Sequence, residues 1–267
     1  MSLFGFLGCG NMGGALASAL AKSIESNRIL LCDANKDKAC ELSERLGANV
    51  ADAKSIAEKC DFIFIGVKPQ GFGELFSEIS PILKNRSDKF VLISMAAGIS
   101  ISAVEKYAGC NASVIRIMPN TPVSVGEGVV LFAANDSVSS QQLAEFKSAM
   151  AFSGMLDEIV EEKIDAASAL SGCGPAFVYM FAEALADGAV ECGLPRDKAM
   201  IYASQMILGS AKLLLESGKH PGQLKDSVCS PGGTTIAGVH ALEDGSFRAS
   251  AMNAVKQAYM RTLELKK

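Results

Sequence analysis

Three glycines near the amino terminus have the spacing of a loop that binds phosphate groups. The apolar run 3–7 leads directly into Gly8–Gly13, which reads G-C-G-N-M-G, and a segment of helical period follows. In such a loop the first glycine permits a tight turn, the second lets the backbone approach a pyrophosphate, and the third allows close helix–strand packing. Backbone N–H groups at the helix start then bind the anion. The loop therefore predicts a dinucleotide site rather than an unliganded turn, with contacts from Gly8, Gly10, Asn11 and Met12.

The residue after the next apolar run bears on which dinucleotide binds. Asp33 directly follows the run 29–32 and lies 20 residues beyond Gly13. A carboxylate at this position hydrogen-bonds the ribose 2′-hydroxyl of NAD(H), whereas a 2′-phosphate would meet like charge there. Lys36 and Lys38 follow closely, but lysines early in a helix usually extend into solvent. Asp33 therefore favours NADH, and NADPH stays open as the alternative.

Three further motifs follow apolar runs, where the loops of an open α/β sheet bind ligands. Val67-Lys68-Pro69 ends the run 61–67, Ala97-Gly98 follows the run 90–94, and Asn120 lies between two prolines after the run 114–118. The alternatives are a surface lysine beside a strand-ending proline at Lys68 and a simple turn at Asn120. We predict that the cofactor site includes Val67, Lys68, Pro69, Ala97, Gly98 and Asn120.

A second glycine-rich motif lies more than two hundred residues away. Ser230-Pro231-Gly232-Gly233-Thr234-Thr235 precedes a helical segment at 236–242. Free N–H groups and threonine hydroxyls at a helix start attract a small anion such as a carboxylate. An ordinary threonine N-cap is the alternative.

The segments that must position these loops alternate in type along the first half of the chain. Strands that alternate with helices predict a parallel sheet covered on both faces, as in an α/β Rossmann-type domain. The strands read as continuous apolar runs, which is typical of buried parallel strands. Apolar runs occur at 3–7, 29–32, 61–67, 90–94, 114–118 and 129–132, and segments of helical period at 12–23, 36–46, 72–83 and 101–107.

Helical segments alone follow from about residue 160. The segment 175–192 is apolar around most of its circumference, apart from an acidic stripe at Glu183, Asp187 and Glu191. A helix of this kind must be buried on most sides, which a small helical domain alone can hardly provide. We therefore predict a dinucleotide-binding domain at 1–160 and an all-α domain at 161–267 that packs against a second subunit. A tight monomeric bundle is the alternative. The helical segments are 163–170, 175–192, 196–217, 223–228, 236–242 and 247–265.

The composition argues against several classes of partner and cofactor. The net charge is −4 and no lysine- or arginine-rich run occurs, which disfavours nucleic acid and anionic membranes. No uninterrupted apolar run approaches the roughly 18 residues of a membrane span. Residues 1–21 are uncharged like a signal peptide, but they lack its positive start, and four glycines from Gly5 to Gly13 interrupt the apolar segment. Eight scattered cysteines without a C-x-x-C pair, and only two histidines, predict no metal site and a cytoplasmic location.

Together these motifs closely resemble the pyrroline-5-carboxylate reductase family along the whole chain. The resemblance rests on the G-x-G-N-M loop, V-K-P at 67–69, A-A-G at 96–98, M-P-N-T-P at 118–122 and S-G-C-G-P-A at 171–176. The most specific motif is S-P-G-G-T-T at 230–235.

The resemblance implies an activity and an assembly. The implied reaction is hydride transfer from NADPH or NADH to the C=N carbon of L-1-pyrroline-5-carboxylate, which yields L-proline in the last step of proline biosynthesis. A Rossmann domain, a helical dimerisation domain and an active site completed across a homodimer are also implied, with dimers commonly assembled into larger rings. Thr235 matches the threonine that contacts the substrate nitrogen, and the Gly233 and Thr234 N–H groups would bind the carboxylate.

Two positions depart from the family pattern. Many members carry an Asn-Arg pair after the second strand, suited to a 2′-phosphate, where this chain has Asp33-Ala34. Many also carry an asparagine near the adenosine side, where Ala53 stands. The first departure puts a preference for NADPH in doubt.

Two other functions compete with the imine reductase. A β-hydroxyacid dehydrogenase joins similar domains, but it would carry a catalytic lysine near the glycine-rich entry at 171–175, and no lysine follows until Lys198. A non-catalytic dinucleotide-binding protein is disfavoured by the motif at 230–235. The residue inventory favours an imine because a protonated imine needs no separate acid, so that catalysis consists largely of aligning two reactants.

Overall fold

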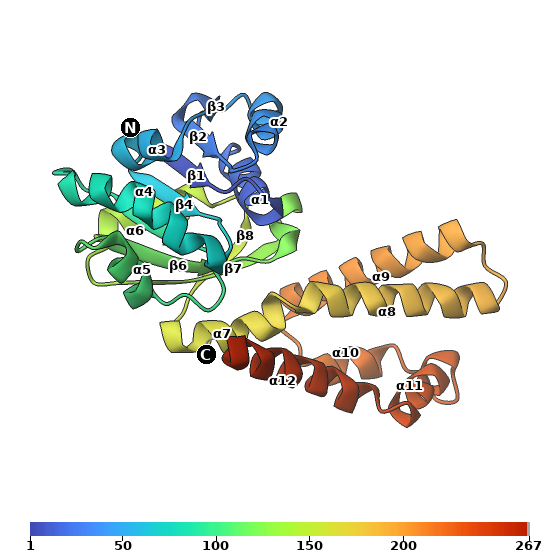
Figure 1. Cartoon of the computed structure of the whole chain (residues 1–267). Coiled ribbons are helices and arrows are strands. Elements are labelled where there is room, and N and C mark those ends of the chain that lie inside the picture. Colours follow the sequence, from blue (N-terminus) through green and yellow to red (C-terminus); the bar gives the residue numbers. More distant parts are fainter. Residues whose placement is uncertain (266–267) are drawn as a thin grey trace. The chain divides into compact units, whose positions relative to one another are not determined.

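The computed structural model describes residues 1–265 and divides them into two compact units (Figure 1). The first unit comprises Met1–Cys173 together with the end of the chain from Ala258, and the second comprises Gly174–Gln257. The first unit contains the glycine loop and the second contains the Ser230–Thr235 motif.

One eight-stranded sheet forms the centre of the first unit, in the order β3-β2-β1-β4-β5-β6-β7-β8. Neighbouring strands from β3 to β6 are parallel, β7 is antiparallel to β6, and β8 is parallel to β7. The strands are β1 (Phe4–Leu7), β2 (Ile29–Cys32), β3 (Asn49–Val50), β4 (Phe62–Ile65), β5 (Val91–Ser94), β6 (Ser113–Met118), β7 (Gly128–Ala134) and β8 (Gly154–Glu158).

The Rossmann-type sheet with a helical domain after it is confirmed, with one correction to the strand directions. The apolar run at 129–132 was expected to add another parallel strand, but β7 runs in reverse. The connection from β6 to β7 contains only the short 3₁₀ helix η3 (Thr121–Val125). A parallel crossover needs a dozen or more residues, so this connection can only return the chain antiparallel to β6.

Helices cover both faces of the sheet, as the sequence predicts. On one face Phe4 stacks on Phe62 and Phe6 stacks on Phe64, with ring centroids 5.0 and 4.4 Å apart. This face is covered by α1 (Asn11–Leu20), α2 (Lys36–Leu46) and α6 (Ser140–Ala149). The other face is covered by α3 (Ala53–Lys59), α4 (Phe72–Asn85), α5 (Ile101–Ala108) and α7 (Glu161–Ser171).

The sequence analysis did not predict two strands and two helices of the first unit. β3 has only two residues, and both are exposed. β8 is an edge strand that includes Asp157 and Glu158, so it lacks the apolar run of a buried strand. The two missed helices, α3 and α6, begin at polar caps, Asp52 and Ser139, whose side chains accept hydrogen bonds from backbone N–H groups. The 3₁₀ helices η1 (Ser26–Arg28) and η2 (Pro69–Gly71) complete this unit.

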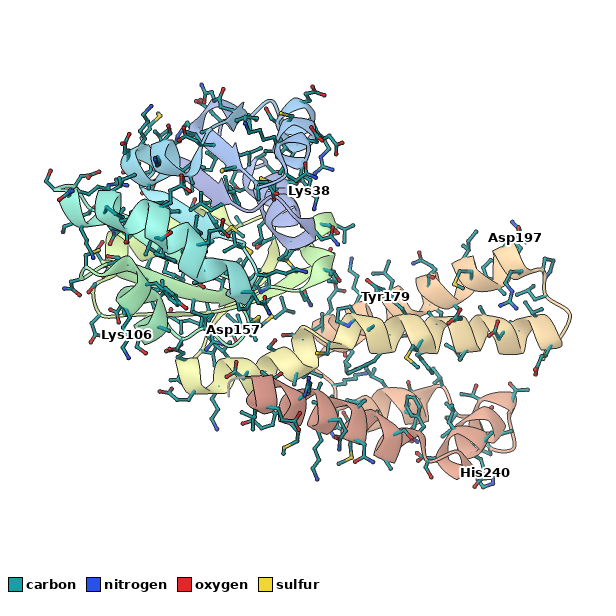
Figure 2. The ribbon with its side chains drawn as sticks, in the orientation of Figure 1. Lys38, Lys106, Asp157, Tyr179, Asp197 and His240 are labelled. Atoms are coloured by element: carbon teal, nitrogen blue, oxygen red, sulfur yellow. The ribbon has the colours of Figure 1, made fainter. Side chains whose placement is uncertain are left out.

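The second unit is entirely helical. Its small core lies between α8 and α9, where Ala186, Ala199 and Ala203 allow the two helices to approach closely. Large apolar side chains of α8, including Tyr179 and Met180, are exposed on the single chain (Figure 2). The helices are α8 (Gly174–Glu191), α9 (Arg196–Ser217), α10 (Pro221–Ser227), α11 (Thr234–Asp244) and α12 (Phe247–Leu265), whose end belongs to the first unit.

Within residues 1–265, one stretch, Glu161–Glu191, is long and apolar enough to cross a membrane by length and composition. Its most apolar window has a mean hydropathy of 1.3, and 11% of that window is buried in the single chain. The stretch consists of α7 and α8, which a turn at Gly172-Cys173 separates. Exposed apolar surface of this kind is also what a subunit interface requires.

Candidate functional site

The glycine loop has three different local environments that match the three predicted roles. A side chain on Gly8 (φ +112°) would lie 2.7 Å from the Gly66 carbonyl carbon, so both the turn and the close contact require glycine. A Cβ on Gly13 would lie 2.0 Å from the Gly8 carbonyl oxygen, so that glycine permits the helix to pack on the loop. Gly10 has open space on its Cβ side, where a ligand can approach the backbone.

The first turn of α1 is open to an anion. Gly10 is the N-cap residue, and no side chain caps the helix start. The N–H groups of the first turn of a helix have no partner within the helix, and the helix dipole makes this end positive. This combination fits a pyrophosphate, and no acidic side chain lies in the first turn to repel one.

A cleft of about 1320 Å³ lies over this loop. It lies at the carboxyl edge of the parallel strands, since its walls include loop residues that follow β1, β4 and β6. That edge is where open α/β sheets bind ligands. The lining residues include Gly10, Asn11, Met12, Gly66, Lys68, Thr121 and Ser124.

The cleft continues between α1 and α2, where several polar side chains line it. Lys38, Arg45 and Ser18 contribute to this part, and Arg45 Nη2 donates to Ser18 Oγ over 3.3 Å (Figure 2 labels Lys38). Lys38 thus faces the cleft, although its sequence position does not distinguish it from a solvated lysine. Thr121 and Ser124 also line the cleft, although the sequence analysis did not assign them to the site; Thr121 belongs to the M-P-N-T-P motif, whereas no motif includes Ser124.

Asp33 fastens the glycine loop to the end of β2. Its Oδ2 accepts from the Cys9 N–H over 2.7 Å, and its Oδ1 accepts from the Asn35 N–H over 2.9 Å. Each carboxylate oxygen retains a lone pair, so a ribose hydroxyl can still donate to Asp33. The carboxylate therefore shapes the loop that lines the cleft.

Cys9 lies inside the loop as an un-ionised thiol. Burial, and secondly the Asp33 carboxylate, raise the pKa of the Cys9 thiol to about 12. The thiol lies 3.4 Å from the Cys32 carbonyl oxygen, to which it donates. A thiol in this state is a poor nucleophile, so the loop offers no covalent chemistry.

Asn120 uses its side-chain amide within the protein. It is 7% exposed, its Nδ2 donates to the Ser171 carbonyl oxygen over 2.9 Å, and its Oδ1 accepts from the Val129 N–H over 2.8 Å. The amide therefore joins the end of β6 to the start of β7 and to the last residue of α7. The amide that the sequence predicts for the cofactor site is thus engaged within the protein, where its bonds hold the backbone of the site.

The predicted cofactor residues divide into two groups by position. Gly10, Asn11, Met12 and Lys68 line the cleft. Gly8 and Asp33 shape the glycine loop but do not belong to the lining within residues 1–265. Among the described residues, those that line the cleft do not include Val67, Pro69, Ala97, Gly98 or Asn120. Ala97 is exposed and Gly98 has φ +77°, so the loop after β5 turns sharply at the same edge of the sheet.

In the second unit, the Ser230–Thr235 motif forms a tight turn that opens α11. Gly232 adopts φ +68°, and the Gly233 N–H donates to the Ser230 carbonyl oxygen over 3.0 Å. Gly233 is the N-cap residue of α11, which no side chain caps. The free donors at this turn are therefore the N–H groups of the first helical turn, which starts at Thr234, and the Gly233 N–H is already engaged.

Both threonines of this motif are exposed, and a hollow of about 500 Å³ lies beside the turn. The hollow is lined by Gly232, Gly233, Ile236, Ala237, Val239, His240 and Glu243 (Figure 2 labels His240). In the described part of the chain, the lining of this hollow does not include Thr234 or Thr235. The free N–H groups and the positive end of the helix dipole at the turn itself are the features that the sequence predicts for a small carboxylate. Within residues 1–265, no three His, Cys, Asp or Glu side chains converge as a metal site would require.

Two family models match the chain. Residues 161–265 match the pyrroline-5-carboxylate reductase dimerisation domain. Residues 3–98 match a family described as NADP oxidoreductase coenzyme F420-dependent.

Individual proteins resemble the chain over its full length. It is 38% identical over 266 residues to pyrroline-5-carboxylate reductase of Escherichia coli strain K12, covering 98% of each protein. A pyrroline-5-carboxylate reductase structure from Coxiella burnetii superimposes with a TM-score of 0.90 at 33% identity, covering 100% of this chain and 99% of the other. A Plasmodium falciparum pyrroline carboxylate reductase with NADP bound gives a TM-score of 0.87 at 33% identity, covering 100% and 98%.

Proposed function

The chain belongs to the pyrroline-5-carboxylate reductase family, and we propose below which of its residues carry out the family reaction. The protein is an NAD(P)H-dependent oxidoreductase that reduces L-1-pyrroline-5-carboxylate to L-proline, the last step of proline biosynthesis. It forms a homodimer through its helical domain and acts on a small molecule. The assignment of residues rests most on the uncapped start of α11 behind Gly232 and Gly233.

The residues over the first cleft fit a dinucleotide. Open space at Gly10 and the uncapped start of α1 suit a pyrophosphate, and Asn11 and Met12 line the same wall. Lys68 also lines the cleft, and its positive charge suits the phosphates. We assign Val67, Pro69, Ala97 and Gly98 to the nicotinamide end, because they follow β4 and β5 at the same edge of the sheet. The bound reduced nicotinamide supplies the hydride.

The motif that opens α11 holds the imine. The N–H groups that begin at Thr234 bind the substrate carboxylate, and the dipole of α11 adds to this attraction. The Thr235 hydroxyl hydrogen-bonds the ring nitrogen and orients it, or relays a proton from water, because a threonine hydroxyl is too weak an acid to act alone. The substrate nitrogen carries its proton before hydride transfer, so the protein needs no strong acid. Catalysis then consists mainly of alignment.

Replacement of Thr235 tests this assignment. Thr235→Ala removes the hydroxyl from an exposed side chain, and we expect kcat/KM to fall by about 10²-fold, a usual effect for a positioned proton-transfer group. Thr235→Ser keeps the hydroxyl and serves as the matched control. The measurement is cofactor oxidation at 340 nm with L-1-pyrroline-5-carboxylate. Near-normal kcat and KM in Thr235→Ala would refute the assignment.

The same assay separates the competing activities. A β-hydroxyacid dehydrogenase would oxidise the cofactor with a β-keto acid semialdehyde and leave the cyclic imine unchanged. A non-catalytic dinucleotide-binding protein would bind the cofactor tightly without turnover. Turnover of the cyclic imine alone is the expected result.

For the cofactor, we propose that NADH is preferred and NADPH is also used. Support comes from Asp33 at the end of β2, whose negative charge disfavours a 2′-phosphate. Lys38 in the wall of the cleft reduces that penalty and keeps the second cofactor usable. The test is kcat/KM for each cofactor in the native protein and in Asp33→Asn. A clear preference for NADPH in the native protein would overturn this interpretation of Asp33.

Further proposals concern domains, assembly and location. We propose domains at 1–160 and 161–267, supported by a family match that begins at Glu161, the first residue of α7. We also propose that the protein acts in the cytoplasm without nucleic acid or membrane partners, and that dimers assemble into a larger ring. Size-exclusion chromatography with light scattering tests the ring, and a dimer mass at micromolar concentration would contradict it. Cosedimentation with anionic vesicles or retention on DNA would contradict the absence of those partners.

A further inference from the structure

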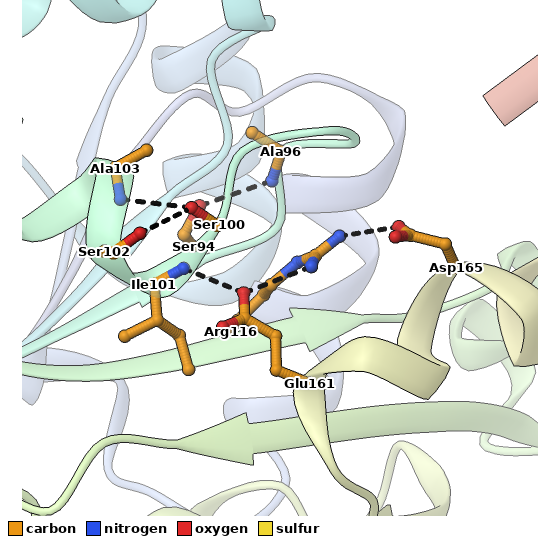
Figure 3. Close-up of polar contacts among 9 residues, drawn as sticks. All are labelled: Ser94, Ala96, Ser100, Ile101, Ser102, Ala103, Arg116, Glu161 and Asp165. Atoms are coloured by element: carbon orange, nitrogen blue, oxygen red, sulfur yellow. Dashed lines mark hydrogen bonds and ion pairs between the residues drawn. The ribbon is translucent and has the colours of Figure 1, made fainter. Parts of the chain in front are cut away.

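A buried arginine joins three elements at the carboxyl edge of the sheet, and the proposed chemistry does not use it directly. Arg116 of β6 is 2% exposed and pairs in register with Ser94, the last residue of β5 (Figure 3). Its Nη2 lies 2.8 Å from Asp165 Oδ1 and its Nη1 lies 3.2 Å from Glu161 Oε1. Both carboxylates belong to α7, so one guanidinium fastens the start of α7 to the sheet.

The Glu161 carboxylate also reaches the loop after β5. The same Oε1 accepts from the N–H of Ile101, the first residue of α5, over 2.8 Å (Figure 3). The loop 95–100 therefore ends at a backbone group that Glu161 holds, and it begins beside Ser94, whose strand partner is Arg116. Ala97 and Gly98 lie between these two fixed points.

A purely structural role explains this cluster poorly. Among the described residues, Arg116 Nε has no hydrogen-bond acceptor although it is buried. Buried ion pairs contribute little net stability, and apolar side chains of similar volume often replace them without loss. Two carboxylates around one guanidinium also make the arrangement directional, since a bidentate arginine fixes both position and angle.

We propose that Arg116 and Glu161 are positioning residues for hydride transfer. Their ion pair holds the loop 95–100 at the nicotinamide end of the cleft, so that the reduced ring is aligned with the imine carbon. The adenosine and pyrophosphate contacts lie elsewhere in the cleft and supply most of the binding energy. Loss of the ion pair therefore lowers the rate of the chemical step and leaves cofactor affinity largely unchanged.

Glu161→Gln is the decisive variant. It keeps the size of the side chain and an oxygen that can accept from Ile101 N–H, but it removes the charge that faces Arg116. We expect kcat to fall at least about 10-fold, since small misplacements of reacting atoms have effects of this size. The dissociation constant of NADH should stay within about twofold, a change worth far less than one lost hydrogen bond. The primary isotope effect with 4-deuterated NADH should rise as hydride transfer becomes rate-limiting.

Glu162→Gln is the matched control, because Glu162 is the adjacent exposed acid in the first turn of the same helix. Arg116→Lys should retain part of the activity that Arg116→Met loses, since lysine keeps the positive charge but lacks the two-pronged guanidinium. If Arg116→Met fails to fold, Glu161→Gln and Arg116→Lys still decide the question. A kcat for Glu161→Gln within about twofold of the control, at a temperature well below its Tm, would overturn the proposal, because misplaced reacting atoms must slow the chemical step.

This inference rests on the proposed nicotinamide contact at Ala97 and Gly98, which a separate variant tests. Ala97→Phe places a ring on the exposed side of the loop and should block cofactor binding. Unchanged NADH binding in Ala97→Phe would show that the proposed contact is wrong. Blocked binding in Ala97→Phe, together with normal kinetics in Glu161→Gln, would refute the positioning role of Glu161 but leave the nicotinamide contact standing.

Discussion

Replacing Gly10 with alanine should separate cofactor binding from folding. Gly10 has φ −68°, which any residue can adopt, and an added Cβ meets no atom within 4 Å. An N-cap alanine costs roughly 1 kcal/mol relative to a good cap, while Gly→Ala gains about 0.4–1 kcal/mol by restricting the unfolded chain. The two effects nearly cancel, so the change in Tm should stay within about 4 °C for a chain of this size.

The effect on the cofactor should be much larger. The new methyl group occupies the space through which the pyrophosphate approaches the backbone of α1. Losing one charge-assisted hydrogen bond there costs about 1.5–3 kcal/mol, which raises Kd by roughly 10- to 150-fold. Gly10→Ala should therefore fold normally and bind NADH weakly.

The assay combines fluorescence titration of NADH with thermal denaturation. Gly73→Ala is the control, because Gly73, in the first turn of α4, likewise has open space at its Cβ but does not line the cleft. Gly13→Ala should instead lower the Tm as well as the NADH affinity, since its Cβ would lie 2.0 Å from a backbone oxygen and the loop must distort. Normal NADH affinity in a folded Gly10→Ala would refute the pyrophosphate assignment.

Three other predictions follow from buried polar groups. Asn120→Ala should lower the free energy of unfolding, measured by urea denaturation, by about 2–4 kcal/mol, because it leaves the Val129 N–H and the Ser171 carbonyl oxygen without their partner. A large loss of NADH affinity at unchanged stability would show instead that the amide acts on the nicotinamide. Burial raises the pKa of Cys9 and of Cys60 to about 12, so both should react with iodoacetamide at pH 8 far more slowly than the exposed Cys40 and Cys192, as peptide mass spectrometry can measure. Because the raised folded-state pKa values favour the protonated thiols, their contribution to stability should be intact below about pH 9 and decline towards pH 12, and a flat profile over that range would contradict it.

Much of the fold follows from local sequence signals. α2 occupies the predicted residues because Asn35 caps its start and Gly47, with φ +67°, ends it. The six apolar runs became strands because both faces of the sheet are covered, so that nearly every residue in them is apolar. The glycine loop was also predictable from local sequence, because each of its glycines is required by the local backbone geometry.

Long-range contacts explain what the sequence could not predict. Arg116 reads as an ordinary charged residue within an apolar run, and its partners Glu161 and Asp165 lie 45 and 49 positions away. The interaction of Asn120 with Ser171 spans 51 positions. No local pattern records such pairs, because they depend on how β6 and α7 meet in three dimensions. The direction of β7 was missed although its short connection to β6 is visible in the sequence.

The reversal of β7 also determines where the chain leaves the nucleotide-binding unit. A helix that follows a strand runs back against it, so α7 after β8 runs in the direction of β1 to β6. Contacts at its two ends agree, since Arg116 holds its start and Asn120, farther along the same strand direction, holds Ser171. Whether the number of strand reversals in the sheet is odd or even thus decides at which edge of the sheet the chain leaves this unit. With one reversal, the chain departs at the edge that holds the cofactor cleft; with none, it would depart from the opposite edge.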